Sequence, residues 1–312
     1  MNPRLFDVYL AIDWSARSKP SPARPFRDSV WVGEYVVHDS EPAETHDWYF
    51  RTRHACEFFL RERLIQHGAK GRRVFVGFDF AFGYPAGSAA AFGLDGGAPP
   101  WRVLWEELAE RIEDGPDNKN NRFQVAAALN TRCGAIATGP FWGCPVNIVS
   151  PSLRSNKQEF AYPYSASAGL ILAEKRITEG RQRGVQPTWK LFGNGSVGGQ
   201  TLLGIPVVHR LRHLPELSDF SRIVPFETGF TRTPTPERGP WITYVEIYSG
   251  VVNDWLEDGM IRDRAQVRAY VHWLARLEAT NDLARLFDRP DGLTEAQAEA
   301  ILREEGWILG VK

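Results

Sequence analysis

Three apolar runs dominate the pattern of hydrophobic and polar positions, and each of them carries one acid. Short runs rich in β-branched and aromatic residues are typical of buried strands. A buried strand has no use for a charge without a partner, so we expect each acid where its strand emerges at the edge of a sheet. The runs span residues 9–16, 74–85 and 242–249, and their acids are Asp13, Asp79 and Glu246.

The order of elements around the first two runs predicts the start of a mixed sheet. Three strands are expected at 7–15, 29–37 and 47–52, followed by a helix at 53–67 and a strand at 73–80. The connections between the first three strands are short, which favours antiparallel neighbours. A helix then separates them from the next strand, which should return parallel to the first.

The rest of the chain is predicted to be mostly helical before the sheet resumes. Residues 83–100 are rich in Gly, Ala and Pro and predict a loop or lid, and 139–145 predict an irregular loop. Residues 84–205 are interpreted as a largely helical insertion into one domain that covers 1–312. Helices are expected at 101–113, 121–131, 165–180, 264–278 and 294–305, with an apolar helix or turn up to 211 and strands at 222–228 and 241–248.

Composition places the chain among ordinary globular proteins. Hydrophobic residues make up 43% of its 312 residues and charged residues 24%, and the formal net charge is -1. A global basic field is therefore excluded, although a local basic patch is not. The three cysteines are odd in number and lack a CxxC spacing, which favours a reducing compartment. Without a leader-like or membrane-length apolar run, we expect a soluble cytoplasmic protein that does not bind membranes.

The acids of the three runs suggest a metal site. Carboxylates brought together cannot all stay ionised unless a cation neutralises them, and Mg²⁺ or Mn²⁺ suits oxygen ligands and phosphate chemistry. Asp282 is our predicted fourth ligand, with Glu278 and Glu227 as rivals. For any single acid, an ordinary ion pair or a strand-end cap is an equally good interpretation.

Several polar and aromatic residues are candidates for binding a phosphorylated substrate, although a solvated surface or simple packing explains each one as well. Trp142 offers a ring on which a base can stack. Residues 193–199 satisfy GxGxxG, a pattern typical of phosphate loops, but a tightly packed loop fits equally well and a dinucleotide site is not favoured. The candidates are Lys19, Lys119, Arg122, Trp142, Lys190, Gly195 and Ser196.

Several segments resemble an uncharacterised family of predicted nucleases within the ribonuclease H-like superfamily. They include Ala11–Asp13, Gly77–Gly83 and Val245–Ser249, and the resemblance spans nearly the whole chain. It implies a ribonuclease H-like α/β fold, in which the first, fourth and fifth strands are parallel and an acid cluster at their ends binds Mg²⁺. That superfamily usually has a further acid on its last core helix, where Glu278 and Asp282 compete.

Together these observations predict a divalent-metal-dependent phosphodiester hydrolase, or nuclease, with Asp13, Asp79 and Glu246 as catalytic residues. Its substrate is expected to be a nucleic acid or a small phosphoester. The first alternative is an ATP-dependent phosphotransferase of the actin/hexokinase-like group, which shares the start of the fold. The second is a non-catalytic nucleotide-binding module. The sequence does not choose between them and does not indicate an oligomeric state.

Overall fold

The computed structural model describes residues 4–38, 41–94, 96–134 and 138–312. Within these residues the chain divides into two compact units. Unit 1 comprises the described residues of 1–79 together with 115–119 and 210–289. Unit 2 comprises those of 80–114 and 120–209 together with 290–312.

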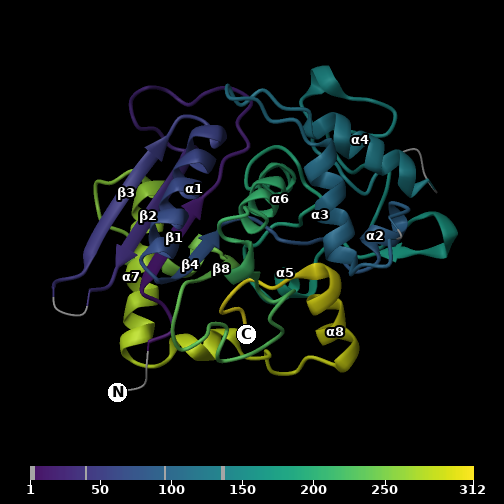
Figure 1. Ribbon diagram of the computed structural model, residues 1–312. Coiled ribbons are helices and arrows are strands. Elements are labelled where there is room, and N and C mark those ends of the chain that lie inside the picture. The colour runs from purple at the N-terminus through teal and green to yellow at the C-terminus, as the bar shows by residue number, and fades with distance from the viewer. Residues whose placement is uncertain (1–3, 39–40, 95, 135–137) are drawn as a thin grey trace. The chain divides into compact units, whose positions relative to one another are not determined.

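Unit 1 is built on a six-stranded mixed sheet in the order β3-β2-β1-β4-β8-β7. Figure 1 labels each of these strands except β7. β1, β2 and β3 are antiparallel neighbours, while β4 and β8 continue the sheet parallel to β1, and β7 is parallel to β8. The prediction of three antiparallel strands followed by parallel ones is therefore confirmed. The strands are β1 (Val8–Asp13), β2 (Val30–Val36), β3 (Glu44–Phe50), β4 (Arg73–Phe78), β7 (Ser221–Ile223) and β8 (Trp241–Glu246).

The two long helices of unit 1, α1 (Arg53–Ala69) and α7 (Arg262–Ala279), cover opposite faces of the sheet. Gly33 of β2 faces α7 so closely that a methyl group there would lie 2.7 Å from the carbonyl oxygen of Val267. The next residue, Glu34, instead reaches Arg63 and His67 of α1. Successive side chains of a strand point to opposite faces of the sheet. Because Gly33 faces α7 and Glu34 faces α1, the two helices lie on opposite faces.

The start of α1 follows from its sequence. Thr52 precedes the helix and its hydroxyl accepts a hydrogen bond from the amide of Ala55 at 3.2 Å, as expected of an N-cap. Cys56, Leu60 and Leu64 then recur at helical spacing on the buried side. Unit 1 also contains the short helical turns η3 (Ser218–Phe220), η4 (Ser249–Trp255) and η5 (Leu283–Phe287).

The regular secondary structure of unit 2 is mainly helical, and the unit packs around a cluster of aromatic rings. The ring of Phe141 lies 5.0 Å from that of Trp189 and 5.4 Å from that of Tyr84, measured between centroids. All three side chains are buried. The elements are α2 (Ser88–Ala91), α3 (Pro100–Arg111), α4 (Arg122–Cys133), α5 (Ile177–Arg181), α6 (Gly198–Arg212), α8 (Glu295–Ala300), the turns η1 (Val146–Ile148), η2 (Ser167–Gly169) and η6 (Ile301–Glu305), and the strands β5 (Tyr164–Ser165) and β6 (Ile171–Leu172).

The predicted helix at 165–180 is wrong. Ala168 and Gly169 both have positive φ angles, of 57° and 74°, so the backbone turns there instead of continuing a helix. The reversal lets β5 pair with β6, and helix α5 begins only at Ile177. The predicted strand at 222–228 is also shorter, because β7 ends at Ile223 and a turn follows.

Among the described residues, no helix combines the length and the apolar character needed to cross a membrane.

Candidate acidic site at the ends of β1 and β4

Asp13 and Asp79 are neighbours at the carboxyl ends of two parallel strands of unit 1. Ile12 and Phe78 are partners in the β1–β4 register, and the amide of Asp79 donates to the carbonyl of Ile12 at 2.9 Å. Asp13 and Asp79 each follow a residue of this last pair, which places both aspartates in one row. Gly33 shares a row with Ala11, two residues before Asp13, so this row lies on the face that α7 covers.

Asp263, in the first turn of α7, completes a cluster of three aspartates. Its charge raises the pKa of both Asp13 and Asp79, so the three acids interact electrostatically. The backbone amide of Asp28 holds Asp263 in place through a hydrogen bond of 2.6 Å. Asp263 was not among the residues predicted from the sequence. Its position at the start of a long predicted helix, where a carboxylate usually stabilises the helix dipole, is the sequence feature that could have indicated it.

Burial and mutual repulsion make these carboxylates unusually reluctant to ionise. Burial raises the pKa of Asp13 well above its ordinary value, and the charges of Asp263, Asp79 and Asp28 raise it further. Burial also raises the pKa of Asp79 to about 6, with Glu246 and Asp263 adding to the effect. Hydrogen bonds from Ser249, whose amide donates to Asp79 at 3.3 Å, act in the opposite direction.

None of the described residues pairs a positive charge with the Asp13 carboxylate. Within the part of the chain that the structure describes, this side chain forms neither a hydrogen bond nor an ion pair. A carboxylate in such surroundings either keeps its proton or binds an external cation. The hard oxygen atoms of the cluster match the preference of Mg²⁺ or Mn²⁺. As the side chains stand, however, no three His, Cys, Asp or Glu residues among those described are arranged closely enough to hold a metal ion.

Glu246 lies beside this cluster but on the other face of the sheet. It pairs in register with Phe78, one residue before Asp79, so alternation turns its side chain towards the face that α1 covers. The side chain is buried, and its charge still raises the pKa of Asp79. Of the three predicted catalytic acids, Asp13 and Asp79 thus lie together on one face of the sheet, and Glu246 lies on the opposite face.

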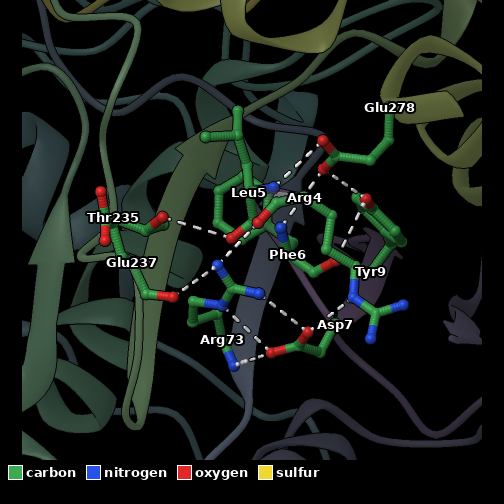
Figure 2. Close-up of polar contacts among 9 residues, drawn as sticks. All are labelled: Arg4, Leu5, Phe6, Asp7, Tyr9, Arg73, Thr235, Glu237 and Glu278. Atoms are coloured by element: carbon green, nitrogen blue, oxygen red, sulfur yellow. Dashed lines mark hydrogen bonds and ion pairs between the residues drawn. The ribbon is translucent and has the colours of Figure 1, made fainter. Parts of the chain in front are cut away.

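Glu278 binds protein groups at the opposite end of β1 (Figure 2). Its carboxylate accepts hydrogen bonds from the amides of Leu5 and Phe6 at 3.0 and 3.2 Å. The hydroxyl of Tyr9 donates to the same carboxylate at 2.8 Å. In the adjoining contacts of Figure 2, Arg73 pairs with Asp7 at 3.0 Å. Glu278 therefore fastens the chain before β1 to the end of α7.

The other two candidates for a fourth ligand also have protein partners. Asp282 follows the carboxyl end of α7 and pairs with Arg285 at 2.9 Å, whereas Asp263 lies at the amino end of that helix. Glu227 accepts hydrogen bonds from the Arg212 guanidinium and from the amide of Ile223, both at 2.8 Å. The structure does not bring Asp282 to Asp13 and Asp79.

Two of the predicted substrate-binding residues belong to unit 1. Lys19 lies in the loop that follows Asp13, and Lys119 lies in the short segment 115–119 that joins this unit. Both side chains are exposed. Asn118, the residue before Lys119, donates to the carbonyl of Lys19 at 3.2 Å, so a hydrogen bond connects the two segments that carry the lysines.

The remaining predicted substrate-binding residues belong to unit 2. Lys190 lies 5.8 Å from the centre of the Trp142 ring and donates to the carbonyl of Asn194 at 2.7 Å. Arg122 is buried and donates to the Asn120 side chain at 2.8 Å, which indicates a structural contact. In the glycine run, Gly195 and Ser196 occupy a turn before α6, and a side chain at Gly198 would collide with the carbonyl of Thr188. Close packing thus explains at least that glycine.

Comparisons of the chain with protein-family models, with curated proteins and with solved structures give no match in any of the three.

Proposed function

We propose that this chain is a divalent-metal-dependent phosphodiester hydrolase whose site is formed by Asp13, Asp79 and Asp263. The proposal depends on one observation above all. Asp13 and Asp79 share a row at the ends of β1 and β4, and the charge of Asp263, in the first turn of α7, raises the pKa of both. Among the described residues Asp13 has no hydrogen-bond or ion-pair partner. If this carboxylate had no role beyond folding, replacing it with a neutral side chain would increase the stability of the folded state.

A Mg²⁺ or Mn²⁺ ion would be held by Asp13 and Asp79 with help from Asp263. When bound, such an ion lowers the pKa of a coordinated water and stabilises the oxygen that leaves the phosphodiester. Glu246, on the other face, would add negative charge beneath the ion without contacting it.

The chain's own groups would orient these carboxylates. The amide of Ser249 donates to Asp79 and the amide of Asp28 donates to Asp263, so each acid is left with free oxygen lone pairs for a cation. Backbone donors fix a carboxylate while leaving its charge in place, which is the arrangement that second-sphere contacts usually have around metal ligands.

The topology of unit 1 supports the same assignment. A meander of three antiparallel strands, a helix and then parallel strands is the order that the resemblance to the ribonuclease H-like superfamily implies. In this proposal the acid on the last core helix is Asp263, in place of the Asp282 that the sequence suggested. Fold likeness alone does not assign a reaction, so the acid cluster carries the argument.

The direct test is hydrolysis of labelled single-stranded DNA, RNA, duplex DNA and bis(4-nitrophenyl) phosphate with Mg²⁺ or Mn²⁺. We expect cleavage of at least one substrate that EDTA abolishes and that Asp79→Asn lowers by 100-fold or more, on the order of the losses seen when essential groups are removed. Glu62→Gln, which removes an exposed acid from α1, serves as the control and should retain full activity. Cleavage that persists in Asp79→Asn, or is absent with every substrate and both metals, would overturn the proposal.

The alternative of an actin- or hexokinase-like phosphotransferase receives no specific support. Those proteins bind ATP between two related halves, each with its own large sheet. In unit 2, the residues that the structure describes form only the two-stranded β5–β6 sheet.

A further inference from the structure

The loop between β1 and β2, residues 14–29, is strongly basic although it borders the acidic site. It contains four cations and no acid before Asp28. Both ends of the loop lie at the cluster, because it follows Asp13 directly and returns where the amide of Asp28 donates to Asp263. The cations are Arg17, Lys19, Arg24 and Arg27.

The first half of this loop is fixed by a buried arginine. Arg53, which is 1% exposed, donates through Nη1 to the carbonyls of Ser15 and Arg17, each at 2.8 Å. The side chain of Asn118 donates to the carbonyl of Lys19. A loop whose carbonyls are bound in this way presents its side chains in a defined direction.

The second half is fastened to β3 and β2. Ser21 and Arg51 exchange two hydrogen bonds of 2.8 Å, and the hydroxyl of Tyr49 donates to the carbonyl of Pro22 at 2.7 Å. Trp31 donates to the carbonyl of Phe26 at 3.4 Å. Three prolines, at 20, 22 and 25, restrict the backbone further. The loop is therefore organised before any ligand arrives.

Three of the four cations of this organised loop form no ion pair with any described residue, and the fourth, Arg27, has one long exposed contact. Among the described residues, Lys19 and Arg24 form no ion pair and are exposed. Arg17 lies over the ring of Phe26, 5.9 Å from its centre, and its Nε is buried without an acceptor. Arg27 has only a 3.8 Å contact with Asp28, in which both side chains are 77% exposed. Their natural complement is an anion from outside the chain.

We propose that the 14–29 loop binds the sugar–phosphate backbone of a single-stranded nucleic acid, with Arg17, Lys19 and Arg24 contacting phosphates and Phe26 stacking on a base. This inference rests on the proposed hydrolase function and names its substrate class. One small phosphoester needs one or two cations, whereas three cations spread along a loop match successive phosphates of a strand. The Arg17 guanidinium lies over the Phe26 ring, yet the Phe26 side chain is still 42% exposed. Part of the ring surface is therefore open for a base to stack on.

Binding is best measured in the Asp79→Asn background with EDTA, by fluorescence anisotropy of a labelled 12-nucleotide single strand. Lys19→Glu and Arg24→Glu should each weaken binding about tenfold or more. Lys70→Glu is the charge-matched control, since Lys70 is exposed at the far end of α1, and it should stay within about twofold of the background variant. Arg17→Gln should lower the slope of log affinity against log salt by about 0.7, the value for one lost phosphate contact on a single strand.

Stacking is tested separately. Phe26→Ala should weaken binding about tenfold, within the range measured for loss of one stacked base, while Phe26→Trp should retain it. Phe58→Ala removes another exposed aromatic side chain of unit 1, on α1, and should leave binding unchanged. Circular dichroism of each variant identifies any that fails to fold. If Lys19→Glu or Phe26→Ala fails to fold, the binding measured with the conservative variants Lys19→Gln and Phe26→Trp decides the test.

Failure of this inference is distinguishable from failure of the proposed function. If bis(4-nitrophenyl) phosphate is hydrolysed but the loop variants bind the strand as tightly as their controls, the loop proposal is wrong and the hydrolase stands. If strand binding depends on the loop but no substrate is cleaved with either metal, the loop proposal stands and the hydrolase fails. Tighter binding of duplex DNA than of the single strand would overturn the assignment of substrate class.

Discussion

Asp263 and Asp282 lie at opposite ends of the helix α7. The helix has 18 residues, which corresponds to a length of about 27 Å at 1.5 Å per residue. Asp263 is in its first turn beside Asp13 and Asp79, and Asp282 follows its last turn and pairs with Arg285. An ion bound to Asp13 and Asp79 can therefore be reached from the amino end of α7 but not from its carboxyl end.

This relationship predicts that Asp263→Asn weakens binding of Mn²⁺ by about tenfold or more, while Asp282→Asn leaves it unchanged. Removing one carboxylate from an oxygen site takes away a charge and a ligand together. Isothermal titration calorimetry at pH 7.5 measures both variants. Weakening by Asp282→Asn alone would place the ion elsewhere.

The raised pKa of Asp79 predicts a stability that falls as the pH rises. The folded protein keeps this proton up to about pH 6, whereas the unfolded chain loses it near 3.8. The folded state thus binds more protons between these two values, and the free energy of unfolding decreases across that window and then levels off. The full shift corresponds to roughly 3 kcal/mol as an upper limit, because the half-buried side chain retains some solvent.

Asp79→Asn removes this titration. In EDTA at pH 8 the variant should be more stable than the wild type by about 1–3 kcal/mol, and the difference should vanish below about pH 4. Urea denaturation at a series of pH values measures it. Parallel stability profiles for the two proteins would contradict the raised pKa.

Divalent cations should stabilise the wild type by offsetting the same repulsion. At a concentration of 100 times its dissociation constant, a bound ion adds about 2.7 kcal/mol to the free energy of unfolding. We expect Tm at pH 7.5 to rise with added Mn²⁺ in the wild type and in Glu62→Gln, but not in Asp13→Asn. An equal rise in Asp13→Asn would show that the ion binds at another site.

Glu278 is predicted to matter for stability and not for metal binding. Glu278→Ala leaves the amides of Leu5 and Phe6 and the Tyr9 hydroxyl without their acceptor, which should cost about 2–4 kcal/mol. The affinity for Mn²⁺ should not change. Chemical denaturation and calorimetry on the same sample separate the two effects, and a variant as stable as the wild type would refute the anchoring role.

Gly33 tests the packing of α7 on the sheet. The methyl group of Gly33→Ala would lie 2.7 Å from a backbone oxygen of Val267, so the helix must shift, which should cost about 2 kcal/mol or more. Gly180→Ala, in a helix with open space around it, is the control and should be neutral or slightly stabilising. Thermal unfolding distinguishes these results, and a neutral Gly33→Ala would contradict the close approach.

Local patterns in the sequence were sufficient for the sheet of unit 1 and for its first helix. The apolar runs of β1 and β4 are long enough to specify buried strands, and Thr52 marks the start of α1. The helix expected at 165–180 failed because the positive φ angles at Ala168 and Gly169 reverse the chain, and alanine there gives no local warning of a turn.

The sequence by itself determined that Asp13 and Asp79 end two buried strands, because an acid at the end of an apolar run can be recognised from the order of residues alone. Only the tertiary structure decided which other acids join them. Strand register turned Glu246 to the opposite face, and the direction in which α7 crosses the sheet brought Asp263 to the cluster and took Asp282 away. The strand register and the direction of α7 depend on how elements distant in the sequence pack together, and no local sequence pattern predicts that packing.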